Sequence, residues 1–122
     1  MSKVNKSNKA NVEVKIGCDI VNIKRFSKLD KKALNKIFHK SEMKKRSWQS
    51  LAGMFAAKES CKKVFNDLNW HDIEIKKEKS QKPILVLHKK KEITSYDISI
   101  SHDARYAIAT VVFLTEKYLN KN

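Results

Sequence analysis

The segment from Ser47 to Phe65 carries the strongest helix signal in this chain and constrains its fold more than any other feature. Apolar residues that recur every three to four positions predict a buried helix face, and Ala and Leu favour the helical state intrinsically. Here that apolar stripe consists of Trp48, Leu51, Ala52, Phe55 and Ala56. We therefore expect one long helix at the centre of the fold, with the other elements packed against it.

Shorter segments in which apolar and polar residues alternate predict strands on both sides of this helix. The first strand is expected from Val12 to Val21, with its second half buried on both faces. Further strands are expected over residues 72–76, 84–87, 98–100 and 106–114. The charged segment His88–Tyr96 predicts a connector with one or two helical turns.

Short helices are expected between the first strand and the long helix. Ile23 and Phe26 are three residues apart, as on one helix face, and Asp30 is a suitable cap for a helix over residues 31–38. Only 2 Gly and 1 Pro occur, which argues against an all-β fold with many tight turns. These features together predict an α+β fold in which a mostly antiparallel sheet packs against the long central helix.

The length of 122 residues corresponds to one compact domain. Residues 1–11 are polar and lysine-rich and predict a flexible basic tail, which leaves residues 12–122 as the single domain. No signal segment opens the chain, and no apolar run is long enough to span a membrane. Because Cys18 and Cys61 are too few for a disulfide scaffold, we expect a cytoplasmic protein.

The net charge is strongly positive, since 27 Lys and Arg stand against 13 Asp and Glu, which gives +14. Most of the basic residues are Lys, so the charge can reflect a solvated lysine surface or codon composition as well as binding. A domain with this charge attracts phosphates, nucleic acids and acidic proteins. A small basic nucleic-acid-binding domain is therefore an alternative, although Trp48, Phe55 and Phe65 lie in helical stripes typical of a core.

Three places carry residues suited to chemistry. Asp19 interrupts an apolar strand, where a carboxylate is costly to bury unless it is paired or binds a metal; its alternative role is to cap the helix that follows. Glu59 and Lys63 share a helix face, as an exposed ion pair or as a metal ligand beside a phosphate-binding ammonium. His102 follows a strand and is suited to act as a base or a phosphate ligand, or is simply hydrogen-bonded. We assign no role to His39, His71 and His88.

Other common sites are excluded by composition. The 2 Gly of the chain, Gly17 and Gly53, cannot form a glycine-rich phosphate loop, and the 2 Cys have no paired His for a structural zinc site. Separated carboxylates with nearby Lys and His side chains instead suit Mg²⁺ bound together with substrate phosphates. The expected chemistry is transfer of a phosphate-linked group.

Four motifs, in order, resemble those of the holo-[acyl-carrier-protein] synthases, the short single-domain phosphopantetheinyl transferases. They are Ile16–Val21 with Arg25, Leu51–Ser60 with Lys63, Lys82-Pro83, and Ser99–Asp103. The likeness spans about residues 12 to 114. It implies transfer of 4′-phosphopantetheine from coenzyme A to a serine of apo acyl carrier protein, with release of 3′,5′-ADP, as a step of fatty acid biosynthesis.

The resemblance also implies a role for each matching residue. Asp19 and Glu59 would bind Mg²⁺ with the coenzyme A pyrophosphate, and Glu59 would act, directly or through a water molecule, as base for the carrier serine. Lys63 would stabilise charge on the leaving group. His102, with Ser101, would bind a nucleotide phosphate and take part in catalysis, while Lys82 and Pro83 would line the adenine side.

The partners follow from the same resemblance. Acyl carrier proteins are acidic, and the family docks its carrier on the first helices, which here carry Arg25, Lys28, Lys31 and Lys32. Such rim charges mainly raise the association rate and set orientation. The family forms homotrimers with active sites between subunits, so we expect a trimer.

Three positions depart from the family pattern. Met54 stands where the family usually has Arg, so one phosphate contact is missing, for which Arg46 or a nearby Lys is a candidate replacement. Asn22 replaces a frequent Glu, and Gln81 replaces a favoured Gly. The Met54 departure keeps open a third interpretation, a relative that binds the carrier without catalysis.

Overall fold

The computed structural model describes residues 10–44, 46–77 and 82–118. Its elements in chain order are β1 (Ala10–Asn22), α1 (Ile23–Phe26), α2 (Lys31–Ile37), α3 (Lys40–Met43), α4 (Trp48–Val64), the 3₁₀ turn η2 (Trp70–Asp72), β2 (Ile73–Lys77), β3 (Pro83–Leu87), β4 (Ser95–His102) and β5 (Tyr106–Tyr118). The expected basic tail lies outside the described residues except for Ala10 and Asn11, which already belong to β1.

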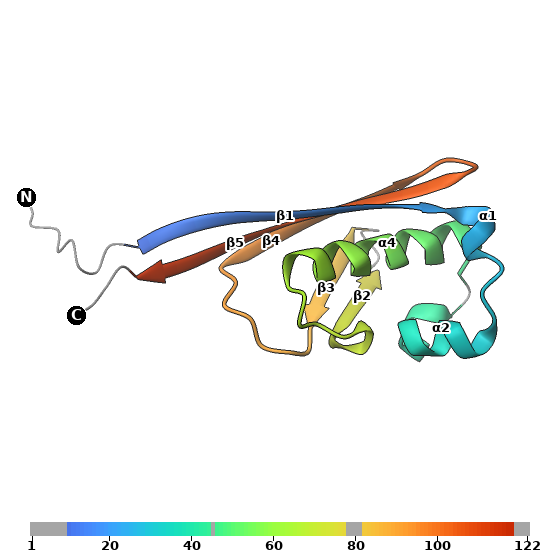
Figure 1. Cartoon of the computed structure of the whole chain (residues 1–122), viewed down its shortest axis with the longest axis horizontal. Helices are drawn as coiled ribbons and strands as arrows, with labels where there is room; N and C mark the ends of the chain where they lie inside the picture. The colour runs from blue at the N-terminus through green and yellow to red at the C-terminus, as the bar shows by residue number, and fades with distance from the viewer. Residues whose placement is uncertain (1–9, 45, 78–81, 119–122) are drawn as a thin grey trace, which may run out of the picture.

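The strands form a long three-stranded antiparallel sheet, in the order β1-β5-β4, and a separate β2–β3 hairpin. In Figure 1 the long sheet runs across the top of the molecule, and α4, α2, β2 and β3 all lie on the same side of it. The sequence-based prediction of an α+β fold with a long central helix is thus confirmed. No helix in the described part of the chain is long and apolar enough to cross a membrane.

Side-chain caps set the starts of the helices. The Asp30 side chain accepts a hydrogen bond from the backbone N–H of Ala33 at 2.9 Å and opens α2, as expected. The start of α1 is capped by Asn22, whose Oδ1 accepts from the Arg25 N–H at 2.9 Å. Because Asn22 fills this position, Asp19 is not the cap of that helix. The connector after β3 contains no helical turn, and β4 already begins at Ser95.

Small residues allow α4 to approach the sheet closely. Ala52, Ala56 and Ala57 of α4 are fully buried, as is Ala107 of β5. Gly17 of β1 is essential to this approach, since a Cβ atom there would lie 2.1 Å from the backbone oxygen of Ser60. The long helix is therefore held against β1 at backbone distance.

No described element covers the outer face of the long sheet (Figure 1), and the side chains on that face are largely apolar. Val12, Val14, Ile16 and Ile20 of β1 are 58%, 67%, 66% and 61% exposed. The expectation that the second half of this strand is buried on both faces is therefore wrong for the single chain. Side chains alternate across a strand, and the helices of this chain cover only one face.

The aromatic residues in and directly after α4 pack mainly against the core. Phe55 and Phe65 are partly buried and pack against it, as expected. Trp48 departs from this prediction, because it is 40% exposed at the start of the helix and contacts Phe26 edge-on at 5.9 Å between ring centroids.

A buried ion pair joins α4 to α3. Lys58 Nζ lies 2.7 Å from Glu42 Oε1, and both side chains are 0% exposed. The same ammonium donates to the carbonyl oxygens of Ile37 and Trp70, at 2.8 and 3.2 Å. Lys58 is thus fully engaged in holding α4 to the α2–α3 region and η2, and it is not available to bind a ligand.

Candidate active site

Asp19 and Glu59 line one cavity of about 340 Å³, although 40 residues separate them in the sequence. Asp19 comes from β1 and Glu59 from α4. The close approach of Gly17 to Ser60 explains the meeting, because Gly17 lies two residues before Asp19 and Ser60 directly follows Glu59. The backbone contact between strand and helix thus positions both carboxylates.

Lys63 joins these carboxylates from the next turn of α4. Its Nζ lies 3.2 Å from Asp19 Oδ1 and donates to the carbonyl oxygen of Cys18 at 2.9 Å. The Lys63 side chain is 56% exposed, whereas that of Asp19 is 19% exposed. The ammonium therefore lies at the rim of the site, where it can contact an anion from solvent.

The environment of Glu59 favours its protonated form. Burial raises the pKa of this carboxyl group, and the nearby Asp19 carboxylate raises that pKa further. Lys62 and Lys63 act in the opposite direction on the same pKa but do not cancel the increase. Two carboxylates that line one cavity are a donor set suited to a hard divalent cation, so these residues fit Mg²⁺.

A second cavity, of about 140 Å³, contains two of the residues expected to contact the nucleotide. Pro83 of β3 and His102 of β4 line it together. Met54 contributes to the same cavity and is fully buried. Lys77, at the end of β2, also lines it and is exposed. Sequence reasoning did not single out Lys77, since it lies outside every motif.

The other two predicted nucleotide residues lie elsewhere. Lys82 Nζ is 3.2 Å from Asp97 Oδ1. Ser101 precedes His102 in β4 and therefore projects from the opposite face of the strand, the outer face of the sheet. Within one chain the structure thus brings Pro83 and His102 together and leaves Ser101 on the other side.

The two cavities share no lining residue. Helix α4 contributes different faces to them, with Phe55 and Glu59 lining the first cavity and Gln49, Ser50 and Met54 the second. The carboxylate group and the His102 group are therefore separate parts of the surface of one chain.

The basic residues expected to bind the carrier lie beside the first cavity. Arg25 of α1 lines that cavity together with Asp19 and Glu59. Lys28, Lys31 and Lys32 follow between α1 and the first turn of α2, and all four basic side chains are exposed. In the described part of the chain, none of the four forms an ion pair.

The departures from the family pattern have different structural settings. Asn22 lines the first cavity and caps α1. Arg46 lines neither cavity and donates its Nε–H to the carbonyl oxygen of Glu42 at 3.1 Å. Lys77 is thus better placed than Arg46 to replace the missing arginine, and Gln81 lies outside the described residues.

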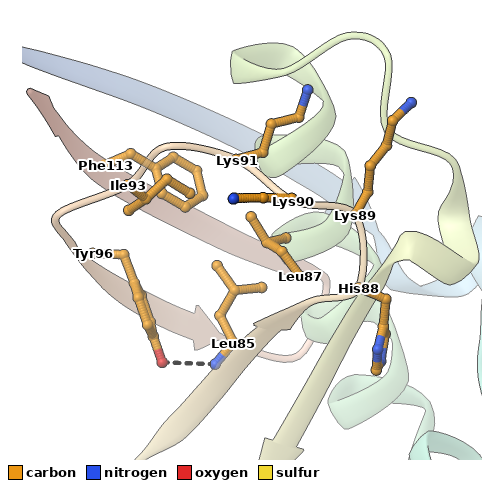
Figure 2. A pocket seen from close by; sticks show the side chains of 9 residues that line it. All are labelled: Leu85, Leu87, His88, Lys89, Lys90, Lys91, Ile93, Tyr96 and Phe113. Carbon is orange, nitrogen blue, oxygen red and sulfur yellow. Dashed lines mark hydrogen bonds between the residues drawn. The ribbon is translucent and has the colours of Figure 1, made fainter. Parts of the chain in front are cut away.

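A larger cavity of about 460 Å³ lies between the β2–β3 hairpin and the long sheet (Figure 2). Leu85, Leu87, Ile93 and Phe113 form its apolar part. Lys89 and Lys91 at its edge pair with the Asp67 carboxylate. None of the predicted catalytic, metal or nucleotide residues lines this cavity, so its size does not make it the active site.

Comparison with known proteins decides the family. The family model of the 4′-phosphopantetheinyl transferase superfamily matches residues 15–111. The chain belongs to this superfamily. It is 40% identical over 112 residues to the holo-[acyl-carrier-protein] synthase of Helicobacter pylori, with coverage of 80% of this chain and 94% of the relative. The Bacillus subtilis synthase is 35% identical over 112 residues, with coverage of 80% and 92%.

Solved structures give the same result. The Helicobacter pylori synthase in complex with coenzyme A aligns with a TM-score of 0.73 at 40% identity, covering 80% of this chain and 98% of that one. A Bacillus anthracis synthase, described as a complex with CoA (3′,5′-ADP), aligns with a TM-score of 0.74 at 30% identity, covering 83% and 96%. The chain is therefore a phosphopantetheinyl transferase of the holo-[acyl-carrier-protein] synthase type, an activity that modifies an apo acyl carrier protein.

Proposed function

We propose that this transferase moves 4′-phosphopantetheine from coenzyme A to a serine of an apo acyl carrier protein, depends on Mg²⁺ and releases 3′,5′-ADP. The observation that carries this proposal is the convergence of Asp19 and Glu59 on one cavity, with Lys63 paired to Asp19. The complexes of two relatives with coenzyme A support the choice of donor. Family membership and this site favour the reaction over the alternative of nucleic-acid binding.

Asp19 and Glu59 are the residues that would hold the metal, together with the pyrophosphate of coenzyme A. Mg²⁺ bound there would polarise a phosphoryl oxygen and help neutralise charge on the leaving group. Lys63 would contact the same phosphates from the rim by exchanging its present contact with Asp19 for a phosphate oxygen.

Glu59 is the proposed general base. The serine hydroxyl of the carrier would give its proton to the Glu59 carboxylate as its oxygen bonds to the phosphorus of the phosphopantetheine group. The bond from that phosphorus to the oxygen of 3′,5′-ADP would break in the same step, and Lys63 would stabilise the departing phosphate.

Arg25, Lys28, Lys31 and Lys32 form the proposed carrier surface. Their place beside the first cavity would let an acidic carrier dock with its serine directed towards Glu59. Fatty acid biosynthesis is the pathway that we propose for this modification. The reducing cytoplasm is the proposed compartment, which two free cysteines support.

A homotrimer with active sites between subunits is also part of the proposal. Two features support it: the apolar outer face of β1 and β5, and the separation of the two cavities. Coenzyme A would bind with its pyrophosphate at Asp19 and Glu59 of one subunit and its nucleotide near Pro83 and His102 of the next. Ser101, on the outer face of the sheet, would then lie near the subunit interface.

Mass spectrometry of an apo carrier protein tests the reaction. Incubation with this protein, coenzyme A and Mg²⁺ should add one phosphopantetheine group. Asp19→Asn and Glu59→Gln should each lower the rate by about 100-fold or more, since each removes a ligand charge and Glu59→Gln also removes the base. Glu92→Gln, at an exposed carboxylate outside both active-site cavities, is the matched control. Full activity of either active-site variant would disprove the proposed site.

A further inference from the structure

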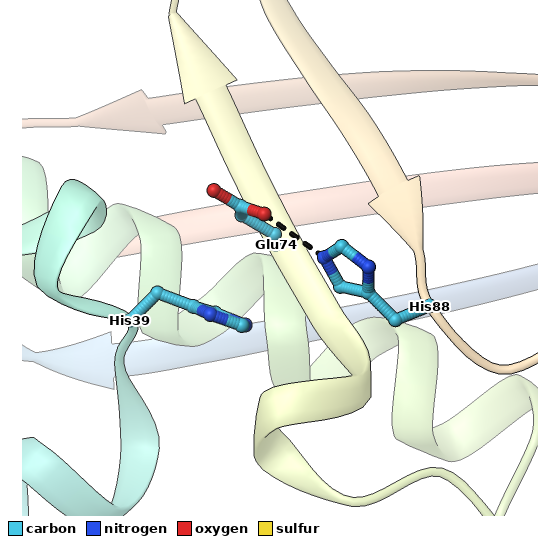
Figure 3. A group of neighbouring side chains, drawn as sticks. All are labelled: His39, Glu74 and His88. Atoms are coloured by element: carbon cyan, nitrogen blue, oxygen red, sulfur yellow. Dashed lines mark hydrogen bonds and ion pairs between the residues drawn. The ribbon is translucent and has the colours of Figure 1, made fainter.

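Two histidines and a glutamate converge outside both active-site cavities (Figure 3). His39 lies between α2 and α3, Glu74 lies on β2, and His88 directly follows β3. One ligand atom from each residue lies within 4.8 Å of the other two. His88 Nε2 and Glu74 Oε1 are only 2.9 Å apart.

Neighbouring groups orient Glu74 and His39. Glu74 is only 9% exposed, and its Oε2 accepts a hydrogen bond from the Ser41 hydroxyl at 2.8 Å. His39 Nε2 lies 3.0 Å from the carbonyl oxygen of His71. When this nitrogen donates to that carbonyl, Nδ1 of His39 carries the lone pair that can bind a metal. A histidine whose second ring nitrogen donates to a backbone carbonyl is the usual arrangement around a protein-bound metal.

We propose that His39, Glu74 and His88 form a binding site for one transition-metal ion of the zinc class, such as Zn²⁺, Co²⁺ or Ni²⁺. Two imidazoles and one carboxylate are ligands that these ions accept, whereas Mg²⁺ prefers oxygen ligands. Ligand atoms around one tetrahedral zinc ion are about 3.3 Å apart. The three groups therefore need only small rotations to bind a common ion, and water would occupy the fourth position.

The ion would connect three segments that are distant in the sequence. It would tie the junction between α2 and α3 to both strands of the β2–β3 hairpin. In its absence the His88–Glu74 contact joins the two strands of the hairpin. An ion that binds only the folded chain raises its stability. The proposed role is therefore structural, and it is independent of the transfer reaction.

Titration of the full, tag-free and metal-stripped chain with Zn²⁺ tests the site. Calorimetry should give one tight equivalent that excess Mg²⁺ does not displace, and the melting temperature should rise. His39→Asn and His88→Asn should each weaken this binding about tenfold or more. His102→Asn controls for an exposed histidine elsewhere, and Glu59→Gln controls for zinc binding at the two-carboxylate site; both should leave the tight equivalent unchanged.

Co²⁺ absorption gives a second readout that needs no variant. The wild-type chain should show the intense visible bands of a four-coordinate ion, and one equivalent of Zn²⁺ should remove them. The absence of a tight equivalent in the wild-type chain would overturn the proposal, as would undiminished binding in both histidine variants. Loss of binding in Glu59→Gln alone would assign the zinc to the other site and equally overturn it.

Discussion

The ammonium of Lys58 is an example of a charge whose role depends on its surroundings. It is fully buried, and desolvation lowers its pKa even though Glu42 favours the charged form. Glu42 in turn accepts from the backbone N–H groups of His39 and Ile75, both at 2.7 Å. The ion pair therefore joins the backbone of three segments. It stabilises the fold because every partner in this buried network is hydrogen-bonded.

We predict that Lys58→Met lowers the free energy of unfolding by about 3 kcal/mol or more, because it leaves the Glu42 carboxylate buried without a counter-charge. Denaturant unfolding followed by circular dichroism measures the change. Lys36→Met, at an exposed lysine of α2, is the matched control. The double variant Lys58→Met/Glu42→Gln should lose less stability than the sum of the two single variants. A loss below about 1 kcal/mol in Lys58→Met would contradict this account.

At the scale of residues, the sequence indicates where a side chain lies better than it identifies the residue that it contacts. Lys58 lies seven residues after Leu51, so helical periodicity indicates that it faces the core. Nothing in the sequence identifies Glu42 as its partner, since the pairing depends on how α3 packs against α4. Asp19 and Glu59 line one cavity, as their grouping requires. That grouping came from their suitability for Mg²⁺ and from the family resemblance, not from their spacing in the sequence.

At the scale of elements, the contact between β1 and α4 places the two carboxylates together. Gly17 and Gly53 are the two glycines of the chain, and both lie where a helix meets a strand. A Cβ atom at Gly17 would lie 2.1 Å from a backbone oxygen, whereas one at Gly53 would lie 2.6 Å from the Ile100 side chain. A side chain can rotate away, but a helix backbone cannot.

Gly17→Ala is therefore expected to destabilise the fold more than Gly53→Ala. Overpacking of this kind costs about 1–3 kcal/mol or more, and we place Gly17→Ala at the upper end. It should also reduce phosphopantetheine transfer by about tenfold or more under conditions where the variant is folded, because it moves Asp19 away from Glu59. Thermal unfolding and the transfer assay, run side by side, check both effects. Equal stability of the two variants would argue against the backbone contact as the positioning element.

The second cavity gives a prediction about the missing arginine. Lys77 lines this cavity with His102, and we expect it to contact a phosphate of coenzyme A in place of the arginine that Met54 replaces. Lys77→Ala should raise the KM for coenzyme A about 3- to 30-fold with a smaller change in kcat, since one charge-assisted hydrogen bond is lost. Steady-state kinetics measure both constants. Lys76→Ala, at the neighbouring exposed lysine outside the cavity, should leave both constants unchanged. An equal effect of both variants would indicate that the positive surface attracts coenzyme A in general, without a specific contact by Lys77.

Element boundaries were predictable where local patterns are strong. The long helix lies within the expected segment 47–65, and the β2–β3 hairpin is shifted by one residue at most. The segment after β3 was less predictable, because its lysines are compatible with both helix and loop. It forms no helix in the structure, and Lys91 instead contacts Asp67 with Nζ 2.6 Å from Oδ1. A contact between residues so far apart in the sequence cannot be predicted from the local pattern of residues.

At the scale of the whole molecule, the outer face of the long sheet is the feature that a single chain does not explain. Side chains of β1 point alternately to the inner and outer faces of the sheet, as expected for a strand. Those on the outer face are as apolar as the side chains of a protein core. A pattern of apolar residues cannot distinguish burial by the same chain from burial by another copy. The expectation of a doubly buried strand was wrong for the monomer for this reason, and it is the arrangement that a trimer would produce.

If each active site is formed by two subunits, two inactive variants should complement each other in mixed oligomers. A site formed within one chain would not allow this. Asp19→Asn and His102→Ala each inactivate a different part of the proposed site, and each alone should be nearly inactive. When the two variants are co-expressed with different tags and mixed trimers are isolated, about a third of the interfaces should combine two intact parts. The transfer assay should then recover about a third of wild-type activity.

The control uses the outer face itself. Ile16→Lys places a charge in the middle of the apolar row on β1, where it is costly to bury between subunits. Light scattering should show a monomer, and mixing should restore no activity when both variants also carry this substitution. If the mixed oligomers of the original variants stay inactive, both parts of each site must come from the same chain. Recovery in the Ile16→Lys background would show instead that the subunits associate through another surface.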